Sequence, residues 1–387
     1  MSPLLGSVAT GLIVAIAIVG WLRLFTLQRI VLPRPVWWTS VAFVGFFAAE
    51  ALSGAANWNG LATLIELGEN LVLLGLLPVY LLLSRDRAAL LDFLLKAAPL
   101  FALAVLAVAL VQSLVFGIRP EGGAGNPAVF AVTVAVLFAF TLANLARAPR
   151  GGELALAAVG IAAAGAALLL SGTRSLWPCL VVFPVLMWLA TRRLRADAKR
   201  PLMLALAAML VMSLAFGGMI RDRLEQARAD LAASQAGQMQ TALGKRLVVW
   251  QVAVEAIAER PLLGHGPDAP RRLMAERTGA IAGQPVIFNH FHDFVLNEMV
   301  RAGLVGTLAL GAMLAVPLGF ALFARRDATA AVGLGLLACF QAAFALSGLV
   351  GIMLDHDIMD AQFMAMTALC LFLLFGADAA RPGPGVP

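Results

Sequence analysis

The chain has 387 residues, of which 61% are hydrophobic and 13% are charged, whereas about a quarter of the residues of an ordinary soluble domain are charged. This composition excludes a soluble globular protein of the usual kind, a disordered chain and, with only three cysteines, a disulfide-rich fold. In a membrane protein the net charge of +6 first reports topology, so we predict no nucleic-acid partner.

Eleven apolar stretches follow one another along the chain, and most approach the length of about 20 residues that a helix needs to cross a bilayer. They lie near residues 4–22, 36–53, 61–83, 97–117, 128–145, 154–171, 175–190, 201–219, 303–323, 329–352 and 359–377. The first stretch lacks a basic start and a cleavage site of small residues, so we interpret it as a retained helix and not as a signal peptide. The sequence therefore predicts an all-α, polytopic integral membrane protein.

The basic residues predict the sidedness of these helices. Sixteen of the 28 Lys and Arg residues lie in the loops that follow odd-numbered spans, whereas the short loops of the opposite set contain only Arg119 and Arg174. By the positive-inside rule the odd loops are cytoplasmic, the N-terminus is outside and the C-terminus is inside. The other ten basic residues lie in one long outer loop, 220–302, and long loops do not count toward this rule.

The long loop divides the chain into four parts. We predict transmembrane helices 1–8 within 1–219, a periplasmic helical loop over 220–302, transmembrane helices 9–11 within 303–377, and a cytoplasmic tail over 378–387.

Helical periodicity continues within the outer loop. It predicts helices over 220–235 and 244–260, then a turn over 261–267, and a third helix that begins at Asn289 as N-cap and reaches Gly303. All four histidines lie on the outer side in this topology, at His265, His290, His292 and His356. We therefore expect any chemistry to face outward.

Two arginines are candidates for binding an anion. Arg246 and Trp250 share a helix face, and the planar guanidinium suits phosphate oxygens; an interfacial arginine beside an aromatic-belt tryptophan is the alternative. Arg174 lies between two apolar spans with almost no loop to solvate it. A charge there is costly unless it is partnered, so Arg174 is either functional or a snorkelling residue that caps a helix.

Acidic residues lie in the outer halves of the second and third spans, at Glu50, Glu66 and Glu69. We expect them to pair with Arg119 or Arg174, or to form a proton relay. The last outer loop offers Asp355 and Asp357, which helix capping explains as well as metal binding does.

The spacing of His290 and His292 does not indicate a metal site. His290 and His292 are two residues apart and would point to different faces of a helix, which argues against a shared metal. No metal is therefore predicted.

Several of these segments resemble the bacterial O-antigen ligases. His292-Asp293, nine residues and Gly303-Leu-Val-Gly306 are similar to the family signature His-[Asn/Ser/Gln]-x9-Gly-x-x-Gly, from which Asp293 departs. The resemblance extends over roughly 120–310 and includes three further motifs: Gly125-Asn126-Pro127, Leu170-Ser-Gly-Thr-Arg174, and Arg246-x-x-x-Trp250 followed by Pro261-Leu-Leu-Gly-His-Gly-Pro267.

The resemblance implies a bacterial inner-membrane glycosyltransferase of the GT-C type, in the Wzy-C-like superfamily of O-antigen ligases and polymerases. Ligases commonly have twelve spans, so we expect about 11–12 here. The implied donor is an undecaprenyl diphosphate-linked glycan held among membrane lipids on the periplasmic side, and the implied acceptor is a sugar hydroxyl of lipid A-core. The transfer would invert the sugar and use no metal, cofactor or ATP.

The resemblance also implies residue roles. Arg174 and Arg246 would bind the diphosphate, and His292, with an ordinary pKa of about 6.5, would accept the proton of the hydroxyl. Asp355 or Asp357 would orient the acceptor or a partner arginine. Supporting positions are Trp250, Arg119 and His290.

Two alternatives stay open at this point. One is a polymerase of the same superfamily that extends the glycan on its carrier. The other is a polysaccharide-lipid transporter that uses Glu50, Glu66 and Glu69, although polar residues gathered on one side do not resemble a transporter site at the bilayer midplane.

Overall fold

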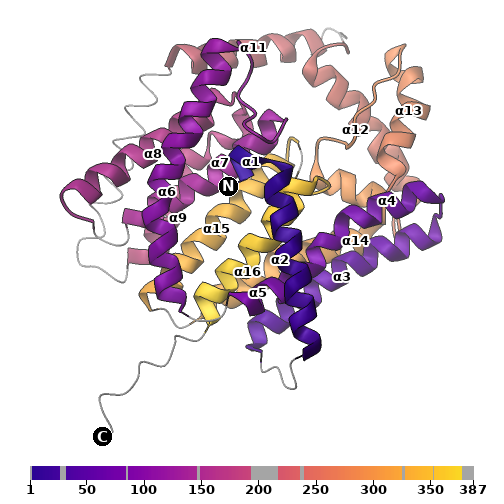
Figure 1. The fold of residues 1–387 in the computed structure, drawn as a ribbon. Coiled ribbons are helices and arrows are strands. Elements are labelled where there is room, and N and C mark those ends of the chain that lie inside the picture. Colours follow the sequence, from indigo (N-terminus) through magenta and orange to yellow (C-terminus); the bar gives the residue numbers. More distant parts are fainter. Residues whose placement is uncertain are drawn as a thin grey trace, which may run out of the picture.

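The structure is a computed structural model that describes residues 2–26, 32–83, 86–145, 149–192, 217–235, 239–324, 327–351 and 353–376. Within these ranges every regular element is a helix (Figure 1), which confirms the predicted all-α class. Ten of the described helical segments are long and apolar enough to cross a membrane, so the chain is a polytopic membrane protein.

The described helices follow the chain in two groups. The first contains α1 (Ser2–Leu5), α2 (Ser7–Thr26), α3 (Arg34–Ala56), α4 (Leu61–Asn70), α5 (Leu76–Leu82), α6 (Arg87–Leu110), α7 (Pro127–Asn144), α8 (Gly152–Leu170) and α9 (Cys179–Thr191). The second contains α11 (Gly217–Gln235), α12 (Ala242–Glu259), α13 (Ala269–Ala282), α14 (Phe294–Phe323), α15 (Ala328–Gly348) and α16 (Asp357–Phe375). A 3-10 segment over Leu71–Gly75 joins α4 to α5 within the third span.

The ten spans correspond to ten of the eleven predicted stretches. The other, 201–219, lies outside the described residues apart from its end, which belongs to α11. The fourth span begins at Arg87 and not at residue 97, because the Asp86 carboxylate accepts hydrogen bonds from the first backbone N–H groups of α6. Arg87 and Lys96, which we expected in a loop, are therefore helical; Arg87 pairs with Asp327, and Lys96 pairs with Asp92.

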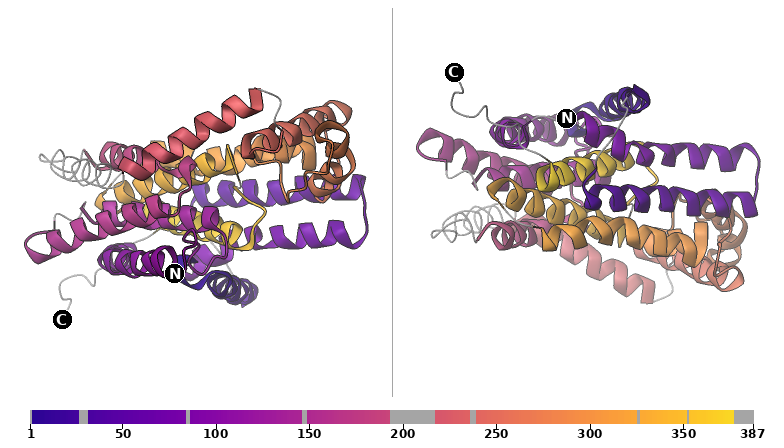
Figure 2. Two further views of the ribbon diagram at one scale, coloured as in Figure 1. Left: turned by 90° about the horizontal axis from the view of Figure 1, so that it is seen from above. Right: turned by 90° about the horizontal axis from the view of Figure 1, so that it is seen from below.

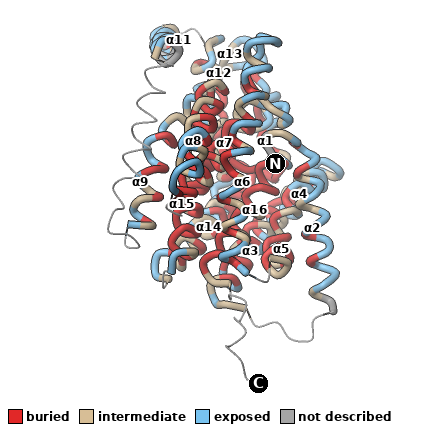
Figure 3. The backbone as a smooth tube through the Cα atoms, turned by 60° about the vertical axis from the view of Figure 1, so that its left-hand side comes forward, coloured by how far each residue is buried: buried red, intermediate tan, exposed pale blue. Residues whose placement is uncertain are grey.

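Three helices form the centre of the bundle. In α7 and α16, 83% of the most apolar window is buried, compared with 17% in α2, and α15 packs against both α7 and α16. Phenylalanine rings fill the contacts; those of Phe344 and Phe363 lie 5.2 Å apart. Buried residues accordingly follow the axis of the bundle, and exposed ones lie at its periphery (Figure 3).

The helices α11, α12 and α13 lie together at one end of the bundle (Figures 1 and 3). α12 and α13 share a small core that includes Val252, Leu273 and Phe291 and packs on α14. We did not predict α13, because its arginines and glutamate interrupt any apolar periodicity. Pro270 in its first turn and the left-handed Gly283 at its end are the signals that mark its limits.

The helix α14 runs along α3 (Figure 2) and connects the segment that contains α11, α12 and α13, here called the outer segment after its predicted position, to the last membrane-spanning helices. It begins after Asp293, whose carboxylate accepts hydrogen bonds from the N–H groups of Val295 and Leu296 at 2.9 Å, so the predicted start at Asn289 is wrong. α14 continues to Phe323 but bends at Gly303, where φ is 64° and ψ is −156°.

Candidate functional site

Arg246 and Arg174 lie close enough to affect each other, although 71 residues separate them in the chain. Arg246 is half-buried on α12, whereas Arg174 is exposed at the start of a 3-10 turn, Arg174–Leu176. Burial lowers the pKa of Arg246, and the positive charge of Arg174 lowers it further. The described residues offer Arg246 no carboxylate partner. Two guanidinium groups in this position favour an anion.

The two histidines before α14 lie in contact. The ring centroids of His290 and His292 are 4.4 Å apart, and Phe288 packs on His292 at 4.5 Å. The expectation that they point to different faces of a helix is wrong, because they precede the helix and His292 has a φ of 56°. A non-glycine residue rarely adopts a positive φ, so the surrounding structure must hold His292 in this conformation.

Both imidazoles are neutral near pH 7. Burial, with the charges of His290 and Arg246, lowers the pKa of His292 to about 3, so the ordinary value that we expected is wrong for this environment. Burial also lowers the pKa of His290, which Asp355 raises and Arg246 lowers. A neutral imidazole can accept a proton, although one with so low a pKa is a weak base until a negative charge lies beside it.

Trp250 fixes the segment from His290 to His292, here called the histidine segment. Its indole Nε1–H donates a hydrogen bond of 2.7 Å to the carbonyl oxygen of Phe291, the residue between the two histidines. The Phe291 side chain is fully buried in the core shared by α12 and α13. Because Arg246 lies one turn before Trp250 on the same helix, α12 both carries a candidate anion-binding residue and fixes the histidines.

Arg119 fixes the backbone that precedes Arg174. Its Nε and Nη2 atoms donate hydrogen bonds of 3.1 and 2.9 Å to the carbonyl oxygen of Ser171, and Thr173 Oγ1 donates to Pro127 O at 3.2 Å. Asn126 caps α7 through the N–H groups of its first turn. The motifs near residues 126 and 174 are therefore parts of one local structure.

Arg301 is the centre of a buried ionic cluster that the sequence analysis missed. Its guanidinium lies 3.2 Å from Glu50, 3.3 Å from Glu66 and 3.1 Å from Asp355, with only 3% of its side chain exposed. The expectation that Glu50 and Glu66 pair with Arg119 or Arg174 is wrong, and Glu69 also lies within the electrostatic reach of Arg301. We had counted Arg301 as a loop charge. The intramembrane glutamates were the signal, because buried carboxylates require a cation.

Asp355 joins this cluster to the histidine segment. Its Oδ1 pairs with Arg301, and its Oδ2 accepts a hydrogen bond of 2.9 Å from Asn297 Nδ2. Asn297 Oδ1 accepts in turn from the N–H of Phe291 at 3.3 Å. Asp357 lies outside this chain of contacts, beside His356, which caps the start of α16.

The turn 261–267 packs into the bend of α14. The N–H of His265 donates to Val300 O at 2.8 Å, the N–H of Gly266 donates to Arg301 O at 3.0 Å, and the N–H of Leu304 donates to Pro261 O at 2.8 Å. These bonds occupy carbonyl and N–H groups that the bend leaves without helical partners.

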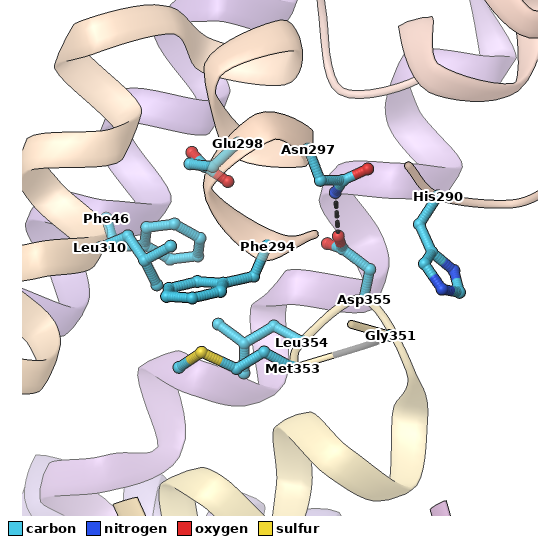
Figure 4. A pocket seen from close by; sticks show the side chains of 10 residues that line it. All are labelled: Phe46, His290, Phe294, Asn297, Glu298, Leu310, Gly351, Met353, Leu354 and Asp355. Carbon is cyan, nitrogen blue, oxygen red and sulfur yellow. Dashed lines mark hydrogen bonds between the residues drawn. The ribbon is translucent and has the colours of Figure 1, made fainter. Parts of the chain in front are cut away.

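A small pocket is lined by His290 and by Asp355 of the ionic cluster (Figure 4). It encloses about 20 Å³, enough for about one water molecule, and its polar lining comes from His290, Asn297, Glu298 and Asp355. Glu298 is 4% exposed, and its Oε1 has no hydrogen-bond partner among the described residues. No group of three or more His, Cys, Asp or Glu residues suited to a metal occurs in the described part of the chain.

Comparison with known proteins finds similarity over one part of the chain. Residues 158–311 match the Wzy_C family, which is described as O-Antigen ligase. An uncharacterized protein of Haemophilus influenzae is 28% identical over 159 residues, which cover 38% of this chain and 39% of that protein. An O-antigen ligase of Pseudomonas aeruginosa is 27% identical over 162 residues, which cover 42% of this chain and 34% of that ligase.

The alignments thus span only about a third to two-fifths of the length of these relatives. They agree with the resemblance drawn from the motifs, because residues 158–311 match the family model described as O-Antigen ligase and one of the relatives is named O-antigen ligase. This segment contains Arg174, Arg246 and His292.

Proposed function

We propose that the protein is a membrane glycosyltransferase that moves a glycan from undecaprenyl diphosphate to a sugar hydroxyl of lipid A-core, as an O-antigen ligase. The observation that carries the proposal is the placement of Arg246, which lies near both Arg174 and a pair of half-buried imidazoles that contact each other and are neutral near pH 7. The family match and the name of the Pseudomonas relative point to the same activity. In this proposal the site faces the periplasm, as the distribution of basic residues predicts.

Arg174 and Arg246 hold the diphosphate of the donor in the proposed reaction. As the acceptor oxygen bonds to the anomeric carbon, the bond from that carbon to the diphosphate oxygen breaks, and the electron pair leaves with the diphosphate. The guanidinium groups stabilise this developing charge and therefore lower the barrier. The nucleophile and the leaving group lie on opposite sides of the carbon, so the transfer inverts its configuration.

His292 accepts the proton of the attacking hydroxyl. In the absence of donor its pKa of about 3 makes it a weak base. A bound diphosphate places negative charge beside the same arginines and histidines, which raises the pKa of His292 because an anion favours the protonated form. The base therefore gains strength when the leaving group is in place.

Transport receives less support from the structure. The glutamates that a transporter would use, Glu50 and Glu66, both pair with the buried Arg301. A carboxylate held in an ion pair is not free to carry an ion or a proton along a pathway unless that pair opens.

The test is transfer by the purified full chain in lipid nanodiscs. The donor is undecaprenyl diphosphate carrying a fluorescent oligosaccharide, and the acceptor is lipopolysaccharide that lacks O antigen. We expect labelled lipopolysaccharide with the wild-type protein and a loss of at least about 100-fold in rate for His292→Ala or Arg246→Ala.

Arg221→Ala is the matched control, because Arg221 is an exposed arginine of the same outer segment, on α11. Its rate should equal that of the wild type. A lengthened glycan on the undecaprenyl carrier, without labelled lipopolysaccharide, would identify a polymerase and contradict the proposed acceptor.

A further inference from the structure

The backbone of Phe291, the residue between the two histidines, is held at both its N–H and its carbonyl group. Trp250 donates to the carbonyl oxygen of Phe291 at 2.7 Å, and Asn297 accepts from its N–H at 3.3 Å. Because the Phe291 ring is also fully buried, neither the side chain nor the backbone of this residue can rotate freely. His290 and His292 flank this residue, so its orientation sets the direction of both rings.

The amide of Asn297 can perform this role in only one of its two orientations. Rotation by 180° would exchange its oxygen and nitrogen and turn an N–H donor toward the N–H of Phe291. Asp355 Oδ2 prevents the exchange, because it accepts a hydrogen bond of 2.9 Å from Asn297 Nδ2 (Figure 4).

Asp355 is itself fixed by the ionic cluster. Its other carboxylate oxygen lies 3.1 Å from Arg301 Nη1, and two further nitrogens of the same guanidinium contact both oxygens of Glu50 at 3.3 and 3.2 Å. A guanidinium held by such a bidentate pair has little freedom to turn. The contacts thus run without a break from Glu50 on α3 to the backbone of Phe291.

We propose that Asn297, Asp355 and Arg301 are positioning residues that hold His292 at the angle required to accept the acceptor proton. This inference rests on the proposed transferase function. The three residues act through the backbone N–H of Phe291, because the contacts described above end there. They also hold the positive φ of His292, which this residue would otherwise rarely adopt.

An exchange of the two polar side chains tests the proposal. Asn297→Asp places two carboxylates next to each other, at positions 297 and 355. Asp355→Asn removes the carboxylate that fixes the orientation of the Asn297 amide, so that this amide can rotate. In the double variant, the carboxylate introduced at position 297 would accept from both the Phe291 N–H and the new amide at position 355, so the connection is restored with the same net charge. Asparagine also tolerates the φ of 66° at position 355.

We expect kcat to fall about 100-fold in each single variant, as for a displacement of about 1 Å in a reacting group, and to return within about fivefold of the wild-type value in the double variant. KM for the donor should change by less than about twofold throughout, because diphosphate binding depends on the arginines. A role in folding alone would lower the yield and the unfolding temperature without this reciprocal recovery of kcat.

Asn59→Asp is the control for the chemical change, because the exposed Asn59 likewise donates a hydrogen bond of 2.7 Å from its amide to an aspartate, Asp268. It should leave kcat unchanged. Wild-type kcat in either single variant, or no recovery in the double variant, would overturn the proposal.

A readout that is independent of transfer separates this inference from the proposed function. In protein with isotope-labelled histidine, the NMR shifts of His290 and His292 should move in the single variants and return in the double variant. If the wild-type protein transfers no glycan while the shifts follow this pattern, the proposed function fails and the positioning network stands. Unchanged histidine shifts would overturn the network whatever the activity.

Discussion

Replacement of Gly303 by alanine should disrupt the packing of the turn 261–267 against α14 and so destabilise the protein. Gly303 combines a φ of 64° with a ψ of −156° inside α14, a region that only glycine enters without strain. A Cβ atom at this position would lie 2.4 Å from the backbone carbon and oxygen of Leu262 and 2.7 Å from the nitrogen of Gly264. The turn 261–267 would therefore have to move away from the helix.

The expected loss of stability has two sources. The backbone conformation costs about 1–3 kcal/mol for a non-glycine residue. Displacement of the turn breaks its four backbone hydrogen bonds with α14, which the N–H groups of His265, Gly266, Leu304 and Val305 donate, and each contributes about 1 kcal/mol. Together we expect the free energy of unfolding to fall by about 5–7 kcal/mol.

Unfolding in mixed micelles of increasing SDS content measures this change. Gly311→Ala is the matched control, because Gly311 lies in the same helix and no atom lies within 4 Å of its added Cβ; this variant should be more stable by up to about 1 kcal/mol. If Gly303→Ala unfolds at the same SDS fraction as Gly311→Ala, the steric and conformational argument is wrong. Transfer activity should also disappear in Gly303→Ala, since the bend positions Arg301, which is connected to the histidine segment through Asp355 and Asn297.

Three further outcomes follow from the site. Arg246→Ala should raise the pKa of His292 above about 3, because it removes a nearby positive charge. An NMR titration of the histidines would measure the shift. An unchanged or lower pKa would contradict the electrostatic argument. Arg301→Gln should lower the free energy of unfolding by about 3–5 kcal/mol, because it leaves buried carboxylates without a cation. Thermal unfolding in detergent measures this change. A loss below about 1 kcal/mol would mean that these carboxylates are already neutral. Trp250→Phe replaces the indole by a smaller aromatic ring and removes the donor to Phe291 O. We therefore expect kcat to fall about 10-fold with an unchanged donor KM, and steady-state transfer kinetics would show whether the loss instead lies in KM.

The membrane helices could be predicted from the sequence because bilayer thickness fixes the length of an apolar run. Their ends were less predictable where polar residues begin a helix. The α6 start at Arg87 depends on the Asp86 cap, and charged residues in its first turns concealed it from a hydropathy count. The start of α14 was misplaced for a related reason: Asn289 and Asp293 are both plausible N-caps, and only the backbone reversal at His292 selects the second.

The candidate site was predictable only in part. Arg174, Arg246 and His292 could be proposed because each belongs to a short motif, and the structure places Arg246 near both of the others. Arg301 could not be found in this way, since its partner Glu50 is 251 residues distant in the sequence and only the packing of α14 on α3 brings them together. The contact between His290 and His292 likewise depends on a φ value that residue spacing does not reveal.

Hydrogen bonds connect the glycine-containing turn 261–267 and the bend at Gly303 to the ionic cluster around Arg301. The turn 261–267 binds the carbonyl groups of Val300 and Arg301, and Ser53 Oγ on α3 lies 2.6 Å from the carbonyl oxygens of both Leu263 and Arg301. The bend thereby keeps the Arg301 backbone beside α3, where its side chain meets Glu50. Since Asn297 lies one turn before Arg301 on the same helix, a change in the bend would move both residues relative to their partners Glu50 and Asp355. The glycines of the motif therefore act on the candidate site through the direction of α14, although none of them carries a group that could take part in the chemistry.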